Sequence, residues 1–336
     1  MNIKLKRVLE LLVLLVITGI ITISSPLNPF VNGAFTQIQN DIFDTAQSIR
    51  NGFLAYTELD GNYGPAIYEF WGLGFLPTST HVVHFVEECI IILAGTAFLY
   101  KTAKLYTSEV FAMISAAVLT IFGWGAWTHA GAEELIFVVL ALTAYHVNRQ
   151  LQSGYLAHHT YLLAIDMGLI FFMQPGYVFI WIVLIVFFAI KFKVDGIDSK
   201  SYRGFYASII EGILTVGVPM ALYLWYFKNA KDFWTNVVVY NIGNMGSFAD
   251  GLSIVCGTPW IILLIVLVLV IVVKAIQKED ISSLCCWLGI SLVIIIVIAL
   301  QGDSLASYRQ LSKVVYIVPL AAVGSLLDKP LGLGSK

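Results

Sequence analysis

Ten apolar stretches constrain this chain more than any other feature of its sequence. A helix needs roughly 20 largely apolar residues to cross the hydrocarbon core of a bilayer, and stretches near that length recur along the whole chain. They cover residues 8–24, 82–100, 109–127, 132–148, 160–173, 176–192, 206–227, 257–275, 282–300 and 310–327. Only 12% of the 336 residues are charged, whereas soluble domains carry roughly 25%. The sequence therefore predicts an all-α, polytopic helical membrane protein with about ten transmembrane helices, and it excludes a water-soluble enzyme.

The charged and cysteine residues exclude two further kinds of site. Lysine and arginine are scattered and the net charge is −2, so the chain has no basic patch for nucleic acid. The four cysteines do not follow the spacing of a metal site. They are Cys89, Cys256, Cys285 and Cys286. We expect them to be small apolar packing residues.

The N-terminus has three basic residues, Lys4, Lys6 and Arg7, followed by an apolar run. This order is also typical of a signal peptide, but no clear small-x-small cleavage site follows in Ser24-Ser25-Pro26-Leu27. We therefore expect an uncleaved first span and a single integral membrane domain over residues 1–336.

The apolar segment 160–192 is too long for one ordinary span, and Gln174-Pro175-Gly176 interrupts it. With a hairpin at Pro175 both termini are cytoplasmic, and fourteen basic residues lie inside against five outside. A single span would leave ten against nine. Because cytoplasmic loops carry the excess of basic residues, the hairpin is favoured. The five external bases are then Arg50, Lys228, Lys231, Arg309 and Lys313.

This topology gives two long external loops, residues 25–80 and 228–256. In the first, apolar residues at helical spacing predict an amphipathic helix from Phe35 to Phe53 on the membrane surface. Its predicted apolar stripe is Ile38, Ile42, Ala46, Ile49 and Phe53. Asp41 and Asp44 lie together on the polar face of this helix. They could form part of a functional site, or they could simply be solvated there. Gly64-Pro65 predicts a turn and a second helix, with Tyr68 and Trp71 at headgroup depth.

In this order the residues resemble the first external loop of the GT-C membrane glycosyltransferases. The resemblance is to bacterial relatives of the protein O-mannosyltransferase and aminoarabinose transferase group (glycosyltransferase family 39-like). Four elements carry it, and together they extend over most of the chain. They are Asp41 to Tyr68 with Gly64-Pro65, His129-Ala-Gly-Ala-Glu133-Glu134, Gln174-Pro175, and Lys231-Asp232-Phe233 through Tyr240-Asn241.

The resemblance implies transfer of a sugar, with inversion, from a polyprenyl-phosphate donor outside the cytoplasm. A carboxylate must then accept the proton of the acceptor hydroxyl. The family's pattern gives this catalytic role to Asp41, with Asp44 as a helper that orients the acceptor or binds a cation. Substrate-binding roles fall to Arg50, Glu58, Tyr68, Glu133, Glu134 and Arg309.

A positive group must also meet the leaving phosphate. Arg309 is the first candidate, followed by Arg50 and Lys313, and each could instead be a headgroup anchor. Glu133 and Glu134 could instead have no role in a site and only stabilise the helix that they begin, because carboxylates at a helix N-terminus interact favourably with its dipole. No metal ligand set is predicted, although a divalent cation at the acidic residues stays open.

The predicted function is therefore a glycosyltransferase of the plasma membrane with an extracytoplasmic site. Its expected partners are the lipid-linked donor, a glycan, lipid or protein acceptor, the bilayer and accessory membrane subunits, but not nucleic acid. Two alternatives remain open: a flippase or transporter of a lipid-linked saccharide, and an inactive GT-C-like subunit. Intramembrane acids would suit a flippase, but flippases often show repeated halves and paired broken helices, and only the break at Pro175 is clear here.

Overall fold

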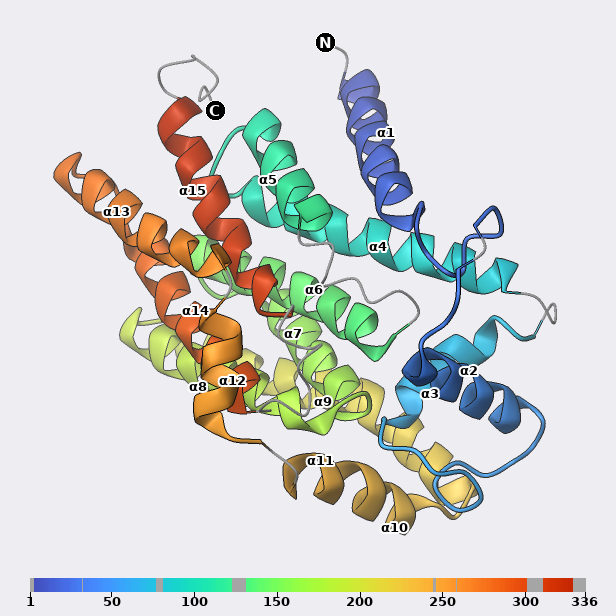
Figure 1. Ribbon diagram of the computed structural model, residues 1–336. Coiled ribbons are helices and arrows are strands. Elements are labelled where there is room, and N and C mark those ends of the chain that lie inside the picture. Colours follow the sequence, from blue (N-terminus) through green and yellow to red (C-terminus); the bar gives the residue numbers. More distant parts are fainter. Residues whose placement is uncertain are drawn as a thin grey trace.

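The computed structural model describes residues 3–31, 33–76, 81–122, 131–243, 246–257, 259–300 and 311–328, and this part of the chain is helical throughout apart from turns and one isolated bridge (Figure 1). The long helices are α1 (Ile3–Thr22), α4 (Val82–Ala103), α5 (Glu109–Phe122), α6 (Ala132–Ser153), α7 (Ala157–Phe171), α8 (Val178–Val194), α9 (Ser199–Tyr226), α13 (Ile262–Ile276), α14 (Ser282–Leu300) and α15 (Ile317–Asp328). The shorter ones are α2 (Gln37–Arg50), α3 (Pro65–Leu73), η2 (Pro175–Tyr177), α10 (Ala230–Phe233), η3 (Trp234–Val239), α11 (Tyr240–Gly243), α12 (Phe248–Cys256) and η4 (Pro259–Ile261).

Among the described residues, six helical segments are long and apolar enough to cross a membrane. They are α4, η2 with α8, α9, η4 with α13, α14, and Leu311–Asp328, which contains α15. The other four predicted spans also form helices: α5 and α7 have 14 and 15 residues, while α1 and α6 carry several charges. The helical membrane class is thus confirmed, and the count of ten spans stays a prediction.

Helix α6 shows why a buried helix of this bundle can be less apolar than an exposed one. It is buried along almost its whole length, because α4, α7 and α14 pack around it. A helix that faces protein on all sides can carry polar residues such as Asn148 and His146, whereas α13 is largely exposed and almost wholly apolar. The hydropathy of each helix therefore follows what it faces.

The predicted break at Gln174-Pro175 separates α7 from α8. Tyr155, just before α7, contacts Phe192, near the end of α8, with ring centroids 5.5 Å apart. The start of one helix thus lies beside the end of the other. The chain therefore reverses at Pro175, as the predicted hairpin requires, whereas two separate membrane spans at α7 and α8 stay a prediction.

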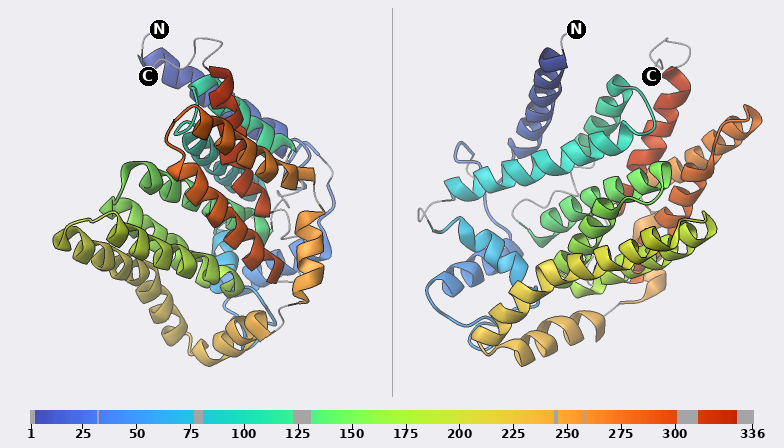
Figure 2. Two further views of the ribbon diagram at one scale, coloured as in Figure 1. Left: turned by 90° about the vertical axis from the view of Figure 1, so that its left-hand side faces the viewer. Right: turned by 180° about the vertical axis from the view of Figure 1, so that it is seen from behind.

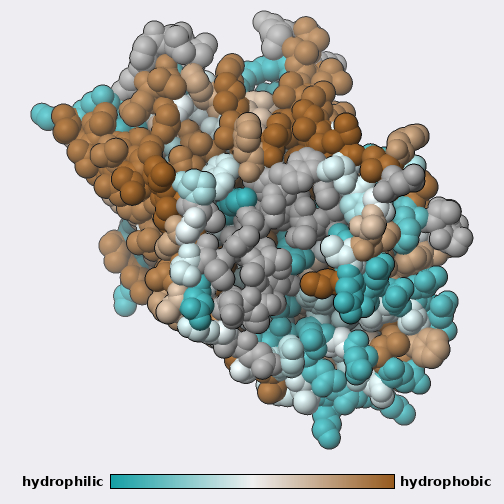
Figure 3. Space-filling view, in the orientation of Figure 1, coloured by the Kyte–Doolittle hydropathy of each residue, from teal (hydrophilic) through white to brown (hydrophobic). Residues whose placement is uncertain are grey.

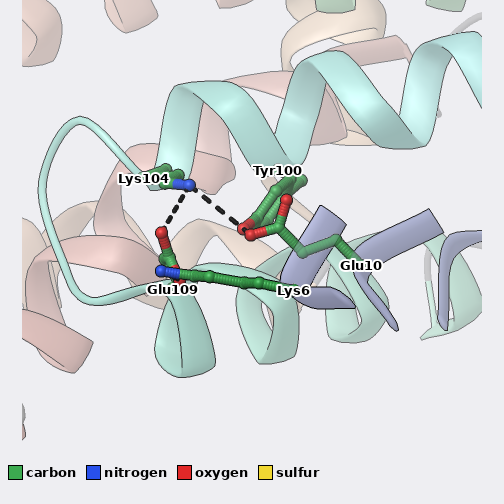
Figure 4. Close-up of polar contacts among 5 residues, drawn as sticks. All are labelled: Lys6, Glu10, Tyr100, Lys104 and Glu109. Carbon is green, nitrogen blue, oxygen red and sulfur yellow. Dashed lines mark hydrogen bonds and ion pairs between the residues drawn. The ribbon is translucent and has the colours of Figure 1, made fainter. Parts of the chain in front are cut away.

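Helix α1 is held by both packing and charge. Leu14, Ile17 and Ile21 are buried in the core, and a polar cluster joins the start of α1 to α4 and α5 (Figure 4). Lys104 lies 2.7 Å from Glu109 and 3.6 Å from Glu10, and Lys6 pairs with Glu109. The α1 helix is therefore part of the bundle.

Both termini lie at one end of the molecule, and the loop helices α2, α3, α10 and α11 lie at the other in every view (Figures 1 and 2). The surface is divided in the same way. Apolar side chains cover the upper part of the face in Figure 3, whereas polar side chains gather at the lower right, over the loops. The fold thus separates a membrane-embedded bundle from a polar loop end.

Candidate active site

Helix α2 begins and ends as the sequence indicates. Thr36 and Gln39 form a reciprocal capping box, in which the Gln39 side chain accepts from the Thr36 N–H at 2.7 Å. The helix ends at Arg50, and Gly52 takes a φ of +97°, which favours glycine. Its bounds, Gln37–Arg50, fall inside the predicted range of Phe35 to Phe53.

The buried face of α2 differs from the predicted stripe. Ile42, Phe43 and Ala46 are buried, whereas Ile38 and Phe53 are more than half exposed. The contact is made with α3 and with the start of α4, and it turns Phe43 inward: its ring lies 5.7 Å from that of Trp71 and 4.9 Å from that of His84. Asp41 and Asp44 stay on the exposed face, as predicted.

Helix α3 starts with Pro65 at its first turn, after the Gly64 N-cap, as predicted. Gly64 donates its N–H to the Met173 carbonyl at 2.8 Å, and a Cβ at Gly64 would lie 2.0 Å from the Phe172 carbonyl oxygen. Only glycine allows this approach, which joins α3 to the break between α7 and α8.

Tyr68 and Trp71 are buried in the protein, so their rings do not face lipid headgroups, and their depth in the membrane stays a prediction. Tyr68 is 3% exposed and Trp71 is fully buried. Trp71 packs between α2 and the start of α4, and its carbonyl is 2.8 Å from the Nε2 atom of His84. Tyr68 instead turns toward the loop that precedes α3. His84 is fully buried as well.

A cavity of about 390 Å³ opens between α2 and the turn 60–63. Its lining residues are Asp41, Ile42, Asp44, Thr45, Asp60, Gly61, Asn62, Tyr63 and Tyr68. Neither Asp41 nor Asp44 is in an ion pair within the part of the chain that the structure describes. The cavity therefore brings together carboxylates from two segments and a buried phenol.

Electrostatics keep that phenol protonated. Burial raises the pKa of Tyr68 above its ordinary value, a hydrogen bond with the Tyr63 backbone opposes this in part, and the charges of Tyr63 and Asp41 raise it further. The Tyr68 hydroxyl consequently remains a hydrogen-bond donor at neutral pH beside the Asp41 carboxylate.

The second loop holds the first by side-chain amides. The Asn241 amide nitrogen donates to the Asn62 carbonyl at 2.8 Å, and its oxygen accepts from Gln174 at 2.6 Å. Asn229 and Asn236 donate to the carbonyls of Ala55 and Tyr56, each at 3.3 Å. The structure therefore joins three of the four elements behind the family resemblance: the first loop, the Gln174 break and the stretch 231–241.

Two of the predicted substrate-binding residues have structural partners. Arg50 donates to the Glu69 carboxylate of α3 at 2.6 Å. Glu58 accepts from the backbone N–H of Leu54 at 2.7 Å and closes the turn there. Neither lines the cavity, whereas Asp41, Asp44 and Tyr68 do.

Glu133 and Glu134 are both buried at the start of α6. Tyr177 lies close enough to interact electrostatically with Glu133 and also with Tyr63 of the cavity wall. Glu134 lies instead on the side of Cys89 and Glu88 of α4. Neither Glu133 nor Glu134 lines the cavity.

Of the three candidates for contact with the leaving phosphate, the structure describes Arg50 and Lys313 but not Arg309. Arg309 and His129 lie outside the described residues. Lys313 is buried, with Nζ 5.8 Å from the centroid of the Trp260 ring, and Trp260 stacks on Tyr316 at 6.0 Å. A buried position does not fit a headgroup anchor for Lys313.

Sequence reasoning did not single out Asp60, Gly61 or Asn62 as site residues. Their only signal is the composition Asp-Gly-Asn, which is typical of any turn. The described residues contain no group of three or more metal-ligating side chains placed to hold a metal ion.

Known proteins give no family assignment for this arrangement of residues. No family model matches the chain, and neither a curated protein nor a solved structure matches it.

Proposed function

We propose that this protein is an inverting glycosyltransferase that uses a polyprenyl-phosphate sugar at the extracytoplasmic face of the plasma membrane. The observation that carries the proposal is the cavity at the loop end of the bundle, with Asp41, Asp44 and Tyr68 in its wall. A lipid-linked donor keeps its chain in the bilayer, so a transferase for it needs a polar cavity beside membrane-spanning helices. The acceptor is a hydroxyl group of a glycan, lipid or protein.

Asp41 would act as the general base. The acceptor oxygen attacks the anomeric carbon, its proton passes to the Asp41 carboxylate, and the bond from the anomeric carbon to the phosphate oxygen breaks with its electron pair on the phosphate. A single displacement of this kind inverts the anomeric centre. The Asp44 carboxylate and the Tyr68 hydroxyl are placed to orient the acceptor, and Asp44 is also the residue through which a divalent cation could act.

The leaving phosphate requires positive charge that the cavity wall does not provide, since three of its lining residues are aspartates. Arg309 is our first candidate for this role, followed by Arg50, which pairs with Glu69, and Lys313. Lys313, buried beside Trp260, would meet a phosphate away from bulk water, where the attraction between opposite charges is stronger.

The test uses membranes that contain the full-length protein and a labelled polyprenyl-phosphate sugar. A transferase releases the lipid carrier and forms a new glycoside. A flippase would move the donor intact, and an inactive subunit would do neither.

The variant Asp41→Asn keeps the shape of the side chain but loses its basicity. Because general-base catalysis contributes about 100-fold or more, we expect transfer to fall by at least that factor, with unchanged protein abundance. The control is Asp250→Asn, an exposed aspartate of α12. Full activity of Asp41→Asn would remove Asp41 from the mechanism.

A further inference from the structure

The segment from Trp225 to Gly243 includes the end of α9, a helix long and apolar enough to cross a membrane, and the short helices that follow it. Helix α9 is apolar and long enough to span, and it ends at Tyr226. Only residues 227–229 separate it from α10, which continues through η3 and α11. Three residues reach about 10 Å at most. The helix that follows must therefore start close to the end of α9 (Figure 1).

This helical segment has two faces. One face packs on the protein through Phe233, Val237, Val238 and Asn241, which are buried. The other exposes Trp234, Val239, Tyr240 and Ile242, each by 41–56%. In the π-helical part, hydrogen bonds run five residues along the chain, so Trp234 and Val239 fall on the same side.

The exposed face has the composition of a lipid headgroup contact. Trp225 and Tyr226, at the end of α9, are 74% and 75% exposed. Tryptophan and tyrosine collect at membrane–water interfaces, where their rings lie at the headgroups. Lys228 and Lys231 are also exposed, and lysines next to a membrane attract anionic lipids.

An exposed apolar stripe on α9 leads to the start of this segment. Ile210, Leu214, Val218 and Leu222 are exposed along that helix at the four-residue spacing of one helical side, and Tyr226 follows four residues later. Because this stripe lies on a helix apolar enough to cross a membrane, lipid, rather than another protein, is favoured as the occupant next to it.

We propose that residues 225–243 lie in the headgroup layer of the leaflet on the loop side, with Lys228 and Lys231 on anionic phospholipid. Since Asn241 binds the Asn62 carbonyl at 2.8 Å and Asn236 binds that of Tyr56, this helical segment fixes the depth of the cavity relative to the lipid. The inference does not depend on the proposed reaction.

The test measures depth with a spin label on the full-length protein in vesicles, after replacement of the four native cysteines by serine. The label is placed by Trp234→Cys, and Val239→Cys repeats the measurement without loss of the indole. Val218→Cys is the control inside the hydrocarbon, and Asn51→Cys, in the exposed end of α2, is the control in water.

We expect the label at 234 to collide with both lipid-dissolved oxygen and a water-soluble nickel chelate, between the two controls. Three results would overturn the proposal: nickel access equal to that at position 51, burial in hydrocarbon equal to that at position 218, or protection from both reagents, which would indicate a protein partner.

The anionic preference is tested in vesicles of phosphatidylcholine alone and of phosphatidylcholine with phosphatidylglycerol. We expect the label at 234 to shift toward the lipid when phosphatidylglycerol is present, and the double variant Lys228→Gln/Lys231→Gln to lose that shift. Lys200→Gln, exposed at the other end of α9, is the matched control and should keep it. An identical depth in both lipids would contradict the role of the lysines.

Discussion

At the scale of single residues, the charges around the cavity are distributed unequally. Arg50 stands on the same helix as Asp41 and Asp44 but pairs with Glu69 on α3, where it fixes the two loop helices to each other. Arg50 therefore does not neutralise Asp41 or Asp44, whose carboxylates line the cavity. A wall of this kind repels phosphate and accepts protons or hydroxyl groups, which divides the proposed reaction between the cavity and a separate cation.

The contact between Gly61 and Tyr68 gives a stability prediction. A Cβ at Gly61 would lie 2.5 Å from the Tyr68 hydroxyl oxygen, which is buried and cannot move aside freely. Gly61→Ala should therefore lower the free energy of unfolding by about 1–3 kcal/mol, the usual cost of overpacking. Thermal unfolding in detergent would measure the change.

Removal of the hydroxyl should relieve this strain. In Gly61→Ala/Tyr68→Phe the nearest remaining atom is 3.2 Å away, so the double variant should be more stable than the sum of the two single changes predicts. Gly19→Ala, where a Cβ meets nothing within 4 Å, is the control. Strictly additive effects would contradict the contact.

At the scale of elements, the second loop stabilises the first. Asn241 is buried and binds both the Asn62 carbonyl and Gln174. Asn241→Ala leaves these groups without a partner, which should cost about 2–3 kcal/mol and make the segment 55–64 sensitive to protease. Asn40→Ala, on the exposed face of α2, should change neither property. Equal protease resistance of both variants would show that the amide contacts do not hold the loop.

The start of α9 gives a pH prediction. Asp198 accepts from the backbone N–H groups of Lys200 and Ser201, and the Ser201 hydroxyl donates to it at 2.6 Å. These hydrogen bonds, that of the Ser201 hydroxyl first, lower the pKa of Asp198. The cap is thus complete above the unfolded pKa of about 3.9 and is lost as the pH falls through the lower folded value.

Amide exchange at residues 200–203 would measure this cap. Protection should decrease toward acid pH in the natural protein, and Asp198→Ala should lack that protection already at neutral pH. Asp195→Asn, in the same turn, is the control, since it interacts with Lys191 and not with the start of α9. Unchanged protection in Asp198→Ala would contradict the capping role.

Local signals predicted the elements well, and the contacts between elements less well. The bounds of α2, Pro65 at the start of α3 and the break at Pro175 follow from short-range chemistry. The inward turn of Phe43 and the burial of Tyr68 and Trp71 depend on α4 and on loop packing, which no local pattern shows. Asp60 lies in the cavity wall together with Asn62, which is bound by Asn241, a residue far away in the sequence.

At the scale of the whole molecule, both termini lie at the end opposite the loop helices. If the loops face outward, an impermeant maleimide should modify Cys256, which is exposed at the end of α12, in intact cells. Tags at the two termini should become accessible to antibody only after permeabilisation. Labelling of a terminal tag in intact cells would reverse the orientation and place the cavity in the cytosol.

The polar cluster that joins Lys6 to Glu109 has a consequence for biosynthesis. The two residues stand 103 positions apart (109 − 6), and ribosomes add about 5–20 residues per second. Glu109 is therefore synthesised about 5–20 seconds after Lys6. If α1 spans the membrane as predicted, its apolar surface alone keeps it in the bilayer during that interval, and the insertion machinery has to tolerate Lys6 without Glu109 until α5 emerges.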